Sequence, residues 1–154
     1  MRIEGVKQAV ALLPMNASVQ AELRETARLL STHYSTQIEG NRLTLQEAER
    51  VLHKTERISG RERDEKEVIG YYRALNELDR LVRRKEIITE KTIQIIHALV
   101  MVGGKSKLKP TPYRDGQNVI KDSRTGAIVY LPPEAKDVPE LMKDLIRWIG
   151  NSKA

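Results

Sequence analysis

Apolar residues recur every three or four positions over long stretches of this chain, and this spacing constrains the fold more than any other feature of the sequence. Such a period places apolar side chains on one face of an α-helix. From Ser18 to Glu39 the pattern continues for roughly 20 residues, which corresponds to a helix about 30 Å long. The expected inward face of this helix consists of Val19, Leu23, Ala27, Leu30, Tyr34 and Ile38. The sequence therefore predicts a mainly α-helical protein.

The long helix is expected to end at Gly40 and Asn41, because these residue types readily adopt the left-handed conformation found at helix C-termini. Ser35 and Glu39 are four residues apart, so their side chains share one face of the last turns. An acid is disfavoured at this end, where the helix dipole places partial negative charge. Glu39 is therefore either a carboxylate that meets a cation from another segment or a solvated terminal residue, and the local sequence favours the second interpretation.

Further helices are expected after this one. Thr44 and Glu47 form a capping box that starts the second helix. An exposed, charged connector at 55–64 precedes the third. Thr89 caps the fourth, which is apolar on more than one side and is therefore predicted to lie in the core, with His97 buried and hydrogen-bonded.

The last third of the chain has a different pattern. A basic, proline-rich loop is expected at 105–112. Two short β-favouring runs at 117–121 and 127–131, separated by a glycine-containing turn, predict a β-hairpin. Paired prolines end its second strand. A second capping box at 137–140 then predicts an apolar closing helix.

The composition limits the possible functions. A chain of 154 residues fits one domain, and the absence of cysteine excludes disulfides and thiolate metal sites. The three histidines lack ligand spacing, which disfavours zinc. No apolar run is long enough to span a bilayer, so we expect a cytoplasmic protein without membrane contact. The net charge of +6 suggests acidic partners, but the basic residues are interleaved with acids, as on a solvated surface.

Several short motifs, taken in chain order, resemble those of Fic proteins. Residues 35–41 are similar to the inhibitory-helix signature of that family, in which Ser or Thr is followed four residues later by Glu and then by Gly or Asn. Residues 112–120 resemble the segment that leads into the family's flap, 129–133 the second flap strand with its paired prolines, and 138–142 the helix that follows. Residues 66–75 and 96–97 resemble two further helical segments of the family. The likeness spans most of the chain.

This resemblance implies a Fic-like helical domain with one β-hairpin flap. Fic enzymes typically transfer AMP from ATP, with Mg²⁺, onto a hydroxyl of a target protein, using a motif histidine as general base and a glycine-rich loop for the phosphates. By the same resemblance Glu39 is the inhibitory carboxylate, which pairs with a motif arginine, and Ser35, Gly40 and Asn41 shape the helix end. Main-chain pairing would hold an extended target segment beside the flap residues Val129, Tyr130, Leu131 and Pro132. Strand termination and packing remain the alternative for Tyr130 and the prolines.

The family's catalytic signature is missing from the sequence: no histidine is followed by Gly-Asn-Gly-Arg, and there is no phenylalanine. We therefore expect a fold truncated before the catalytic helix-loop-helix. Its parts would be a lead-in segment at 1–16 that docks on the body, the inhibitory and following helices at 17–53, and the N-terminal part of the Fic domain with its flap at 54–154.

Such a chain is expected to be inactive alone and to bind neither ATP nor Mg²⁺ by itself. Its expected partners are the missing C-terminal Fic segment and a protein target. We also expect self-association through apolar area around Trp148. The alternative function is a non-enzymatic helical binding or regulatory module, whose basic surface would bind an acidic protein or nucleic acid.

Overall fold

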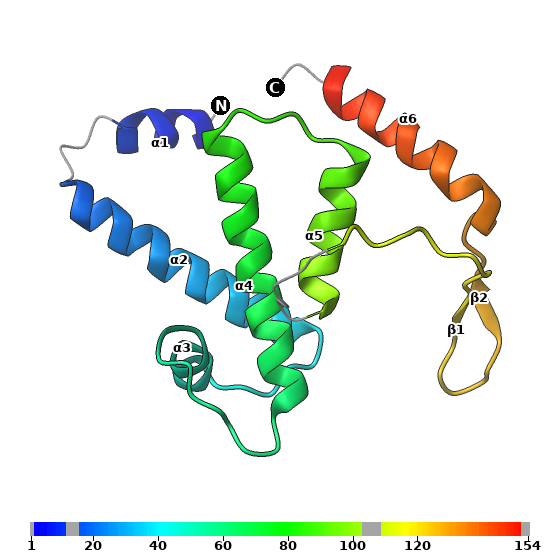
Figure 1. Ribbon diagram of the computed structural model, residues 1–154, viewed down its shortest axis with the longest axis horizontal. Coiled ribbons are helices and arrows are strands. Elements are labelled where there is room, and N and C mark those ends of the chain that lie inside the picture. The colour runs from blue at the N-terminus through cyan, green and yellow to red at the C-terminus, as the bar shows by residue number, and fades with distance from the viewer. Residues whose placement is uncertain (1, 12–15, 103–108, 152–154) are drawn as a thin grey trace.

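The computed structural model describes residues 2–11, 16–102 and 109–151 (Figure 1). This part of the chain is mainly helical and carries one small antiparallel hairpin, as predicted. In chain order the elements are α1 (Arg2–Ala11), α2 (Ala17–Ile38), α3 (Leu45–His53), α4 (Glu62–Arg83), α5 (Glu90–Val102), β1 (Ile120–Lys121), β2 (Ile128–Tyr130), the 3-10 turn η1 (Ala135–Asp137) and α6 (Val138–Asn151).

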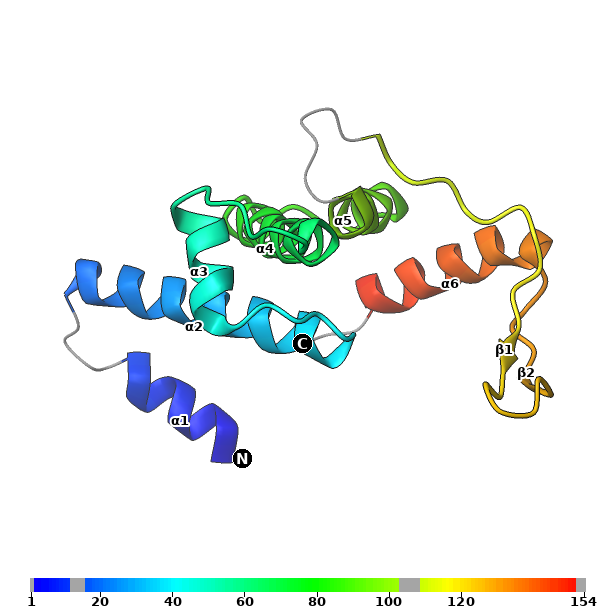
Figure 2. The same ribbon diagram turned by 90° about the horizontal axis from the view of Figure 1, so that it is seen from below.

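Helix α4 is the central element, and α2, α3 and α5 all pack against it. The hairpin and α6 lie beyond α5, on the side away from α2 and α3 (Figures 1 and 2). Among the described elements, α6 contacts α5 and the turn that precedes it. The fold is therefore open, with a helical body and an arm made of the hairpin and α6.

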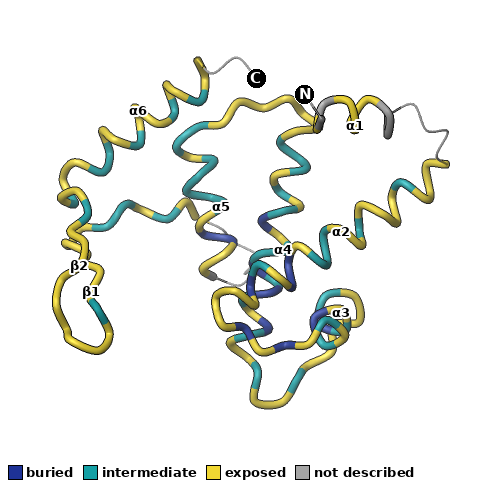
Figure 3. Tube along the Cα trace, turned by 180° about the vertical axis from the view of Figure 1, so that it is seen from behind, coloured by how far each residue is buried: buried dark blue, intermediate teal, exposed yellow. Residues whose placement is uncertain are grey.

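The buried residues gather where α2, α3 and α4 meet (Figure 3). The predicted capping box is present at the start of α3: the Glu47 amide donates to Thr44 Oγ1 at 3.2 Å, and the Thr44 amide donates to Glu47 Oε2 at 2.8 Å. The bond from the Thr44 amide lowers the pKa of Glu47. With its start fixed in this way, α3 contributes two of the four core residues, which are Leu43, Ala48, Val51 and Val68.

A buried glutamate ties the connector between α3 and α4 to the body. Glu65 is 1% exposed, and its carboxylate accepts hydrogen bonds from the Ile58 amide and from Arg57 Nη1. Ile58 packs against the core at the same place. The connector that the sequence predicted is therefore mostly exposed, as expected, but it is anchored, and α4 begins before its predicted end.

The predicted inward face of α2 is wrong. Helix α2 instead packs through polar residues, and Thr32, His33 and Thr36 are its buried side chains. The two threonine hydroxyls donate to carbonyls one turn earlier, Thr32 Oγ1 to Arg28 O at 2.8 Å and Thr36 Oγ1 to Thr32 O at 2.9 Å. Because carbonyls of the same helix accept hydrogen bonds from these hydroxyls, burying the two threonines leaves no hydroxyl donor unpaired. The residues expected inside are exposed, namely Val19, Leu23, Ala27, Tyr34 and Ile38.

Side-chain contacts also hold α2 on α4. The Tyr72 hydroxyl donates to Glu25, and the Arg28 guanidinium pairs with Asp79 and, at 2.7 Å, with Glu25. Burial and the bond to Glu25 both raise the pKa of Tyr72. These contacts fix the first half of α2, while the buried threonines fix its second half.

Two expectations about histidine burial and helix capping are also wrong. His97 is exposed, although the next two residues on α5, Ala98 and Leu99, are buried, because α5 meets α4 and α6 on other sides. At the start of α6 the chain enters through the turn η1, and Glu140 pairs with Lys143 at 3.1 Å rather than closing a capping box. Thr89, in contrast, caps α5 as predicted, since its Oγ1 accepts from the Thr92 amide at 3.1 Å.

The expected docking of the lead-in segment rests on the apolar residues 10–13, of which 12 and 13 lie outside the described residues. Residues 2–11 of this segment form the helix α1, on which Ile3 and Val6 are exposed. Most of the predicted basic loop lies at 105–108, outside the described residues; Lys109 is exposed. No helix in the described ranges is long and apolar enough to cross a membrane.

Candidate functional site

The end of α2 has the left-handed stop that the sequence predicted. Gly40 has φ +91°, its amide donates to Gln37 O at 2.9 Å, and the next amide, that of Asn41, donates to Thr36 O at 3.1 Å. This pair of bonds is the Schellman motif, which satisfies the last free carbonyls of a helix. The motif places Glu39 at the C-cap position.

Replacing Gly40 by alanine is expected to lower the free energy of unfolding by about 1 kcal/mol, because L-residues pay roughly 1–2 kcal/mol for the left-handed conformation. Space is not the cause, since a Cβ at Gly40 would meet no atom within 4 Å. Gly116 is the matched control: it also has open space but not a positive φ, so alanine there should stabilise by about 0.5 kcal/mol. Urea denaturation of both variants measures whether each alanine lowers or raises the free energy of unfolding. Equal changes in the two variants would contradict the left-handed conformation of Gly40 as the cause of its loss.

Asn41 is buried at 6% exposure and joins three segments. Its Nδ2 donates to the Asp64 carbonyl at 2.9 Å and to Glu67 Oε2 at 3.1 Å, both on α4. Its Oδ1 accepts from the Leu43 amide at 3.1 Å. Asn41 therefore does more than end a helix: it fixes the end of α2 to α4 and to the chain entering α3.

Ser35 is held by a residue that the sequence gave no reason to pair with it. The Tyr71 hydroxyl, from α4, donates to Ser35 Oγ at 3.0 Å. No hydrogen bond links Ser35 to Glu39 in the described part of the chain. Ser35 and Tyr71 are 36 positions apart in the sequence, so no local pattern could have identified Tyr71 as the partner of Ser35.

Glu39 is exposed at the tip of this anchored end. Among the ion pairs of the described residues, none involves Glu39. Its carboxylate therefore points to solvent at the negative end of the helix dipole, where a negative charge is disfavoured by about 0.3–1 kcal/mol. An incoming cation would remove this cost.

The predicted hairpin forms with shorter strands than expected, pairing Ile120 with Tyr130 and Lys121 with Ile128. Asp122 organises its turn, because Oδ1 accepts from the amides of Arg124 at 2.9 Å and Thr125 at 2.7 Å. The bond from the Thr125 amide is the main reason that the pKa of Asp122 is lowered. Both strands are exposed on both faces, and each leaves one edge unpaired.

Two side chains close the base of the hairpin. Arg114 donates to the carbonyls of Pro133 and Gly116, and Gln117 Nε2 donates to the Pro132 carbonyl at 3.0 Å. The paired prolines therefore serve as acceptors as well as strand terminators. Nearby, Tyr113 donates to Glu90 Oε2 at 2.8 Å, which links this segment to α5.

The structure does not bring the two predicted groups of site residues together. No contact joins α2 to the hairpin or to α6 among the described elements, and the hairpin lies apart from the end of α2 in both views (Figures 1 and 2). Val129, Tyr130 and Leu131 are exposed, and Pro132 is half-buried. The two groups could act on one ligand only through a further polypeptide between them.

The described residues do not fit Mg²⁺, and the sequence does not supply a loop that fits the phosphates of ATP. No group of three His, Asp or Glu side chains in the described ranges is arranged to hold a metal ion. The sequence also lacks the glycine-rich phosphate loop that the resemblance implies.

Solved structures share this fold, although no protein-family profile matches the sequence. A Fic domain-containing signaling protein from Bacteroides thetaiotaomicron superposes with a TM-score of 0.75 at 20% identity, over 90% of this chain and 51% of that one. For a Fic family protein from Desulfovibrio desulfuricans the TM-score is 0.71 at 22% identity, over 99% of this chain and 45% of that one. The chain has a Fic-like fold, as the motifs predicted, and it spans about half the length of these proteins.

Proposed function

We propose that this chain is the regulatory and flap portion of a cytoplasmic protein adenylyltransferase, which transfers AMP from ATP to a hydroxyl of a target protein and is autoinhibited through Glu39. The Fic-like fold supports the enzyme class. The chain matches about half of each of the two similar solved structures, which supports a further catalytic segment. The observation that carries the regulatory role is the exposed Glu39, without an ion pair in the described structure, at the anchored end of α2.

The residues around Glu39 would hold its carboxylate ready for a cation. Asn41 and the pair of Ser35 with Tyr71 fix the last turns of α2 on α4, so little conformational entropy would be lost when the carboxylate binds. An arginine of the catalytic segment is the proposed partner, because a carboxylate and a guanidinium can form two parallel charge-assisted hydrogen bonds. While so paired, that arginine would be unable to bind the nucleotide.

The hairpin would hold the protein target. Its strands are short and exposed, each with a free edge, and an extended peptide can add to such an edge by main-chain hydrogen bonds. Arg114 and Gln117 would keep the flap at a fixed angle to the segment that leads into it. Val129, Tyr130 and Leu131 are then the residues nearest the target hydroxyl.

Incubation of the 154-residue chain with radiolabelled ATP and Mg²⁺ tests the fragment assignment. We expect no transfer of labelled AMP to the chain or to added proteins, because the sequence has no histidine followed by a phosphate-binding loop. Robust transfer by these 154 residues alone would overturn the assignment.

Glu39→Gly, in a form of the protein extended to include a Fic catalytic signature, tests the inhibitory role. Loss of a charged hydrogen-bonded pair is worth about 1.5–3 kcal/mol, so self-modification should rise roughly ten- to hundredfold. Glu39→Gln should give a smaller increase, and Glu49→Gln, at an exposed acid on α3, should have no effect. Unchanged self-modification in Glu39→Gly would remove Glu39 from this role.

A further inference from the structure

A small pocket lies between α2 and the C-terminal half of α4, and most of its lining residues are arginines. Its volume is about 300 Å³, at the lower end of the range for ligand sites, so it fits a small ligand or one group of a larger one. Five lining residues lie three or four positions apart on one face of α4 and its C-cap, and the sixth comes from α2: Asn76, Asp79, Arg80, Arg83, Arg84 and Arg28. We call this feature the arginine pocket.

Arg28 is the contribution of α2 to the arginine pocket, and contacts on several sides fix it. Its side chain is 16% exposed, and its guanidinium pairs with Asp79 and, at 2.7 Å, with Glu25. The guanidinium also stands over the Tyr72 ring, 5.9 Å from the ring centroid. Asp79 is the one acid among the described residues that line the pocket. Because Arg28 already binds this carboxylate, Asp79 presents no unpaired negative charge to a ligand.

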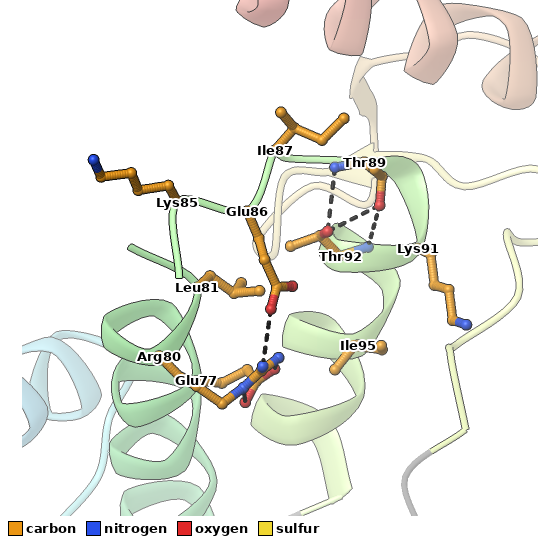
Figure 4. A pocket seen from close by; sticks show the side chains of 10 residues that line it. All are labelled: Glu77, Arg80, Leu81, Lys85, Glu86, Ile87, Thr89, Lys91, Thr92 and Ile95. Atoms are coloured by element: carbon orange, nitrogen blue, oxygen red, sulfur yellow. Dashed lines mark hydrogen bonds and ion pairs between the residues drawn. The ribbon is translucent and has the colours of Figure 1, made fainter. Parts of the chain in front are cut away.

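Arg80 is also paired with acids, but these line a different pocket. Figure 4 shows Glu77 and Glu86 with Arg80 in the neighbouring pocket between α4 and α5, where the N–O distances are 2.6 and 3.1 Å. The bond from Arg80 is the main reason that the pKa of Glu77 is lowered, so this carboxylate stays ionised and bound. Neither glutamate is among the residues that line the arginine pocket. The two acids therefore neutralise Arg80 without lining the space that a ligand would fill.

Three donor groups of the arginine pocket remain for a ligand. The side chains of Arg83 and Asn76 are exposed and have no hydrogen bond or ion pair with any described residue. Arg84 is 3.7 Å from Glu86, which Arg80 holds more closely, so the Arg84 guanidinium is only weakly engaged. The pocket thus offers two guanidinium groups and one amide NH₂ to acceptor oxygens.

The helix dipole explains only part of this cluster. Cations are favoured near a helix C-terminus, which accounts for Arg83 and Arg84. It does not account for Asn76, two turns earlier, or for Arg28 on another helix. Arg80 also precedes Arg83 and Arg84 by three and four positions, where like charges repel each other. A bound anion would relieve this repulsion.

We propose that the arginine pocket binds a phosphate monoester group, held by the guanidinium groups of Arg83 and Arg84 and by the amide of Asn76. Such a group has three acceptor oxygens and a charge of about −2, which matches two cations and three donor groups. Guanidinium forks bind phosphate oxygens in pairs. A carboxylate has one charge and two oxygens, and a phosphodiester has one charge, so each would leave a cation of the pocket unpaired.

This proposal does not depend on the adenylyltransferase assignment, because no lining residue belongs to the hairpin or to the end of α2 that carries Glu39. The phosphate group could come from a small phosphate ester or from a phosphorylated side chain of another protein. The two sources share the chemistry that the pocket would recognise, and they differ in what surrounds the phosphate.

Methyl phosphate, a small phosphate monoester, is the first probe. Titrated into the ¹⁵N-labelled full chain at about pH 7.5 and about 50 mM NaCl, it should give saturable amide shifts within residues 76–84. The dissociation constant should be millimolar and should rise with salt, since both cations are exposed. Dimethyl phosphate and acetate, with one negative charge each, should bind at least tenfold more weakly.

A blocked peptide with one central phosphoserine distinguishes the two sources. Affinity at least tenfold above that of methyl phosphate assigns the pocket to phosphorylated proteins, and a smaller difference assigns it to small phosphate esters. Either result supports the phosphate site.

The double variant Arg83→Gln, Arg84→Gln should weaken methyl phosphate binding at least tenfold, because it removes both available charges while keeping residues that favour a helix. Arg42→Gln, Arg124→Gln makes the same change in net charge at exposed arginines outside the pocket and should alter binding less than threefold. Asn76→Ala keeps every charge and should weaken binding about fivefold through the lost amide donor. Circular dichroism checks that all variants fold.

Four results would overturn the proposal. They are absence of saturable shifts up to about 20 mM methyl phosphate, equal loss in the two double variants, equal affinity for dimethyl phosphate, and tighter binding of duplex DNA that depends on Arg83 and Arg84. The last result would make the pocket part of a nucleic-acid surface instead.

Discussion

Asn41→Ala is expected to lower the free energy of unfolding by about 3 kcal/mol and to release the end of α2 from α4. The substitution removes three hydrogen bonds from a buried side chain, to the Asp64 carbonyl, the Glu67 carboxylate and the Leu43 amide. Each such bond contributes about 1 kcal/mol, and leaving the buried Leu43 amide unpaired adds to the loss. Leu43 also belongs to the buried apolar cluster of the described core, with Ala48, Val51 and Val68, so a change at its amide disturbs that cluster directly.

Urea denaturation followed by circular dichroism measures this effect. Asn118→Ala, at an exposed asparagine, is the control and should change the free energy of unfolding by less than about 0.5 kcal/mol. Asn41→Asp should be at least as damaging as alanine, because it places a second negative charge beside Glu67, and adding Glu67→Gln should recover part of the loss. A loss below 1 kcal/mol for Asn41→Ala, or no recovery in the double variant, would show that Asn41 only ends the helix.

Local chemistry predicted the boundaries of the elements well. Gly40, the Thr44–Glu47 capping box, the Thr89 cap and the hairpin all act over a few residues, and each has the predicted conformation or bond. The same locality explains why Asn41 was recognised only as a helix terminator. Its α4 partners lie 23 and 26 positions further along the chain, beyond the reach of any cap or turn rule.

Helix faces were predicted less well, because periodicity shows that a helix is amphipathic but does not show which neighbour covers which face. On α2 most of the apolar stripe is exposed, and the buried side chains are Thr32, His33 and Thr36. On α5 the exposed His97 lies directly beside buried residues. For the candidate site the outcome was similar: motif order indicated Glu39 and the flap residues, but the supports from Tyr71, Arg114 and Gln117 became visible only in three dimensions.

The exposed apolar faces of the helices predict that the isolated chain self-associates. The chain exposes 12169 Å², whereas a compact monomer of its mass exposes about 7,900 Å². The excess of about 4,000 Å² in one chain is larger than the roughly 1,000–2,500 Å² that each partner of an obligate dimer buries. Apolar side chains contribute to it on α6, where Leu141, Leu145 and the 68% exposed Trp148 lie at positions that share one helical face. We expect a second copy to cover these faces wherever a catalytic segment does not.

Sedimentation velocity between about 1 and about 200 µM should therefore show a monomer–dimer equilibrium with a micromolar dissociation constant, or about −8 kcal/mol. Leu145→Glu should raise that constant roughly 100-fold, because a buried unpaired charge costs at least 2–3 kcal/mol at an interface. Lys143→Gln makes the same change in net charge on the polar side of α6 and should leave the constant within a factor of three. A chain that stays monomeric at every concentration, or equal effects of the two variants, would mean that these apolar faces do not hold two copies together.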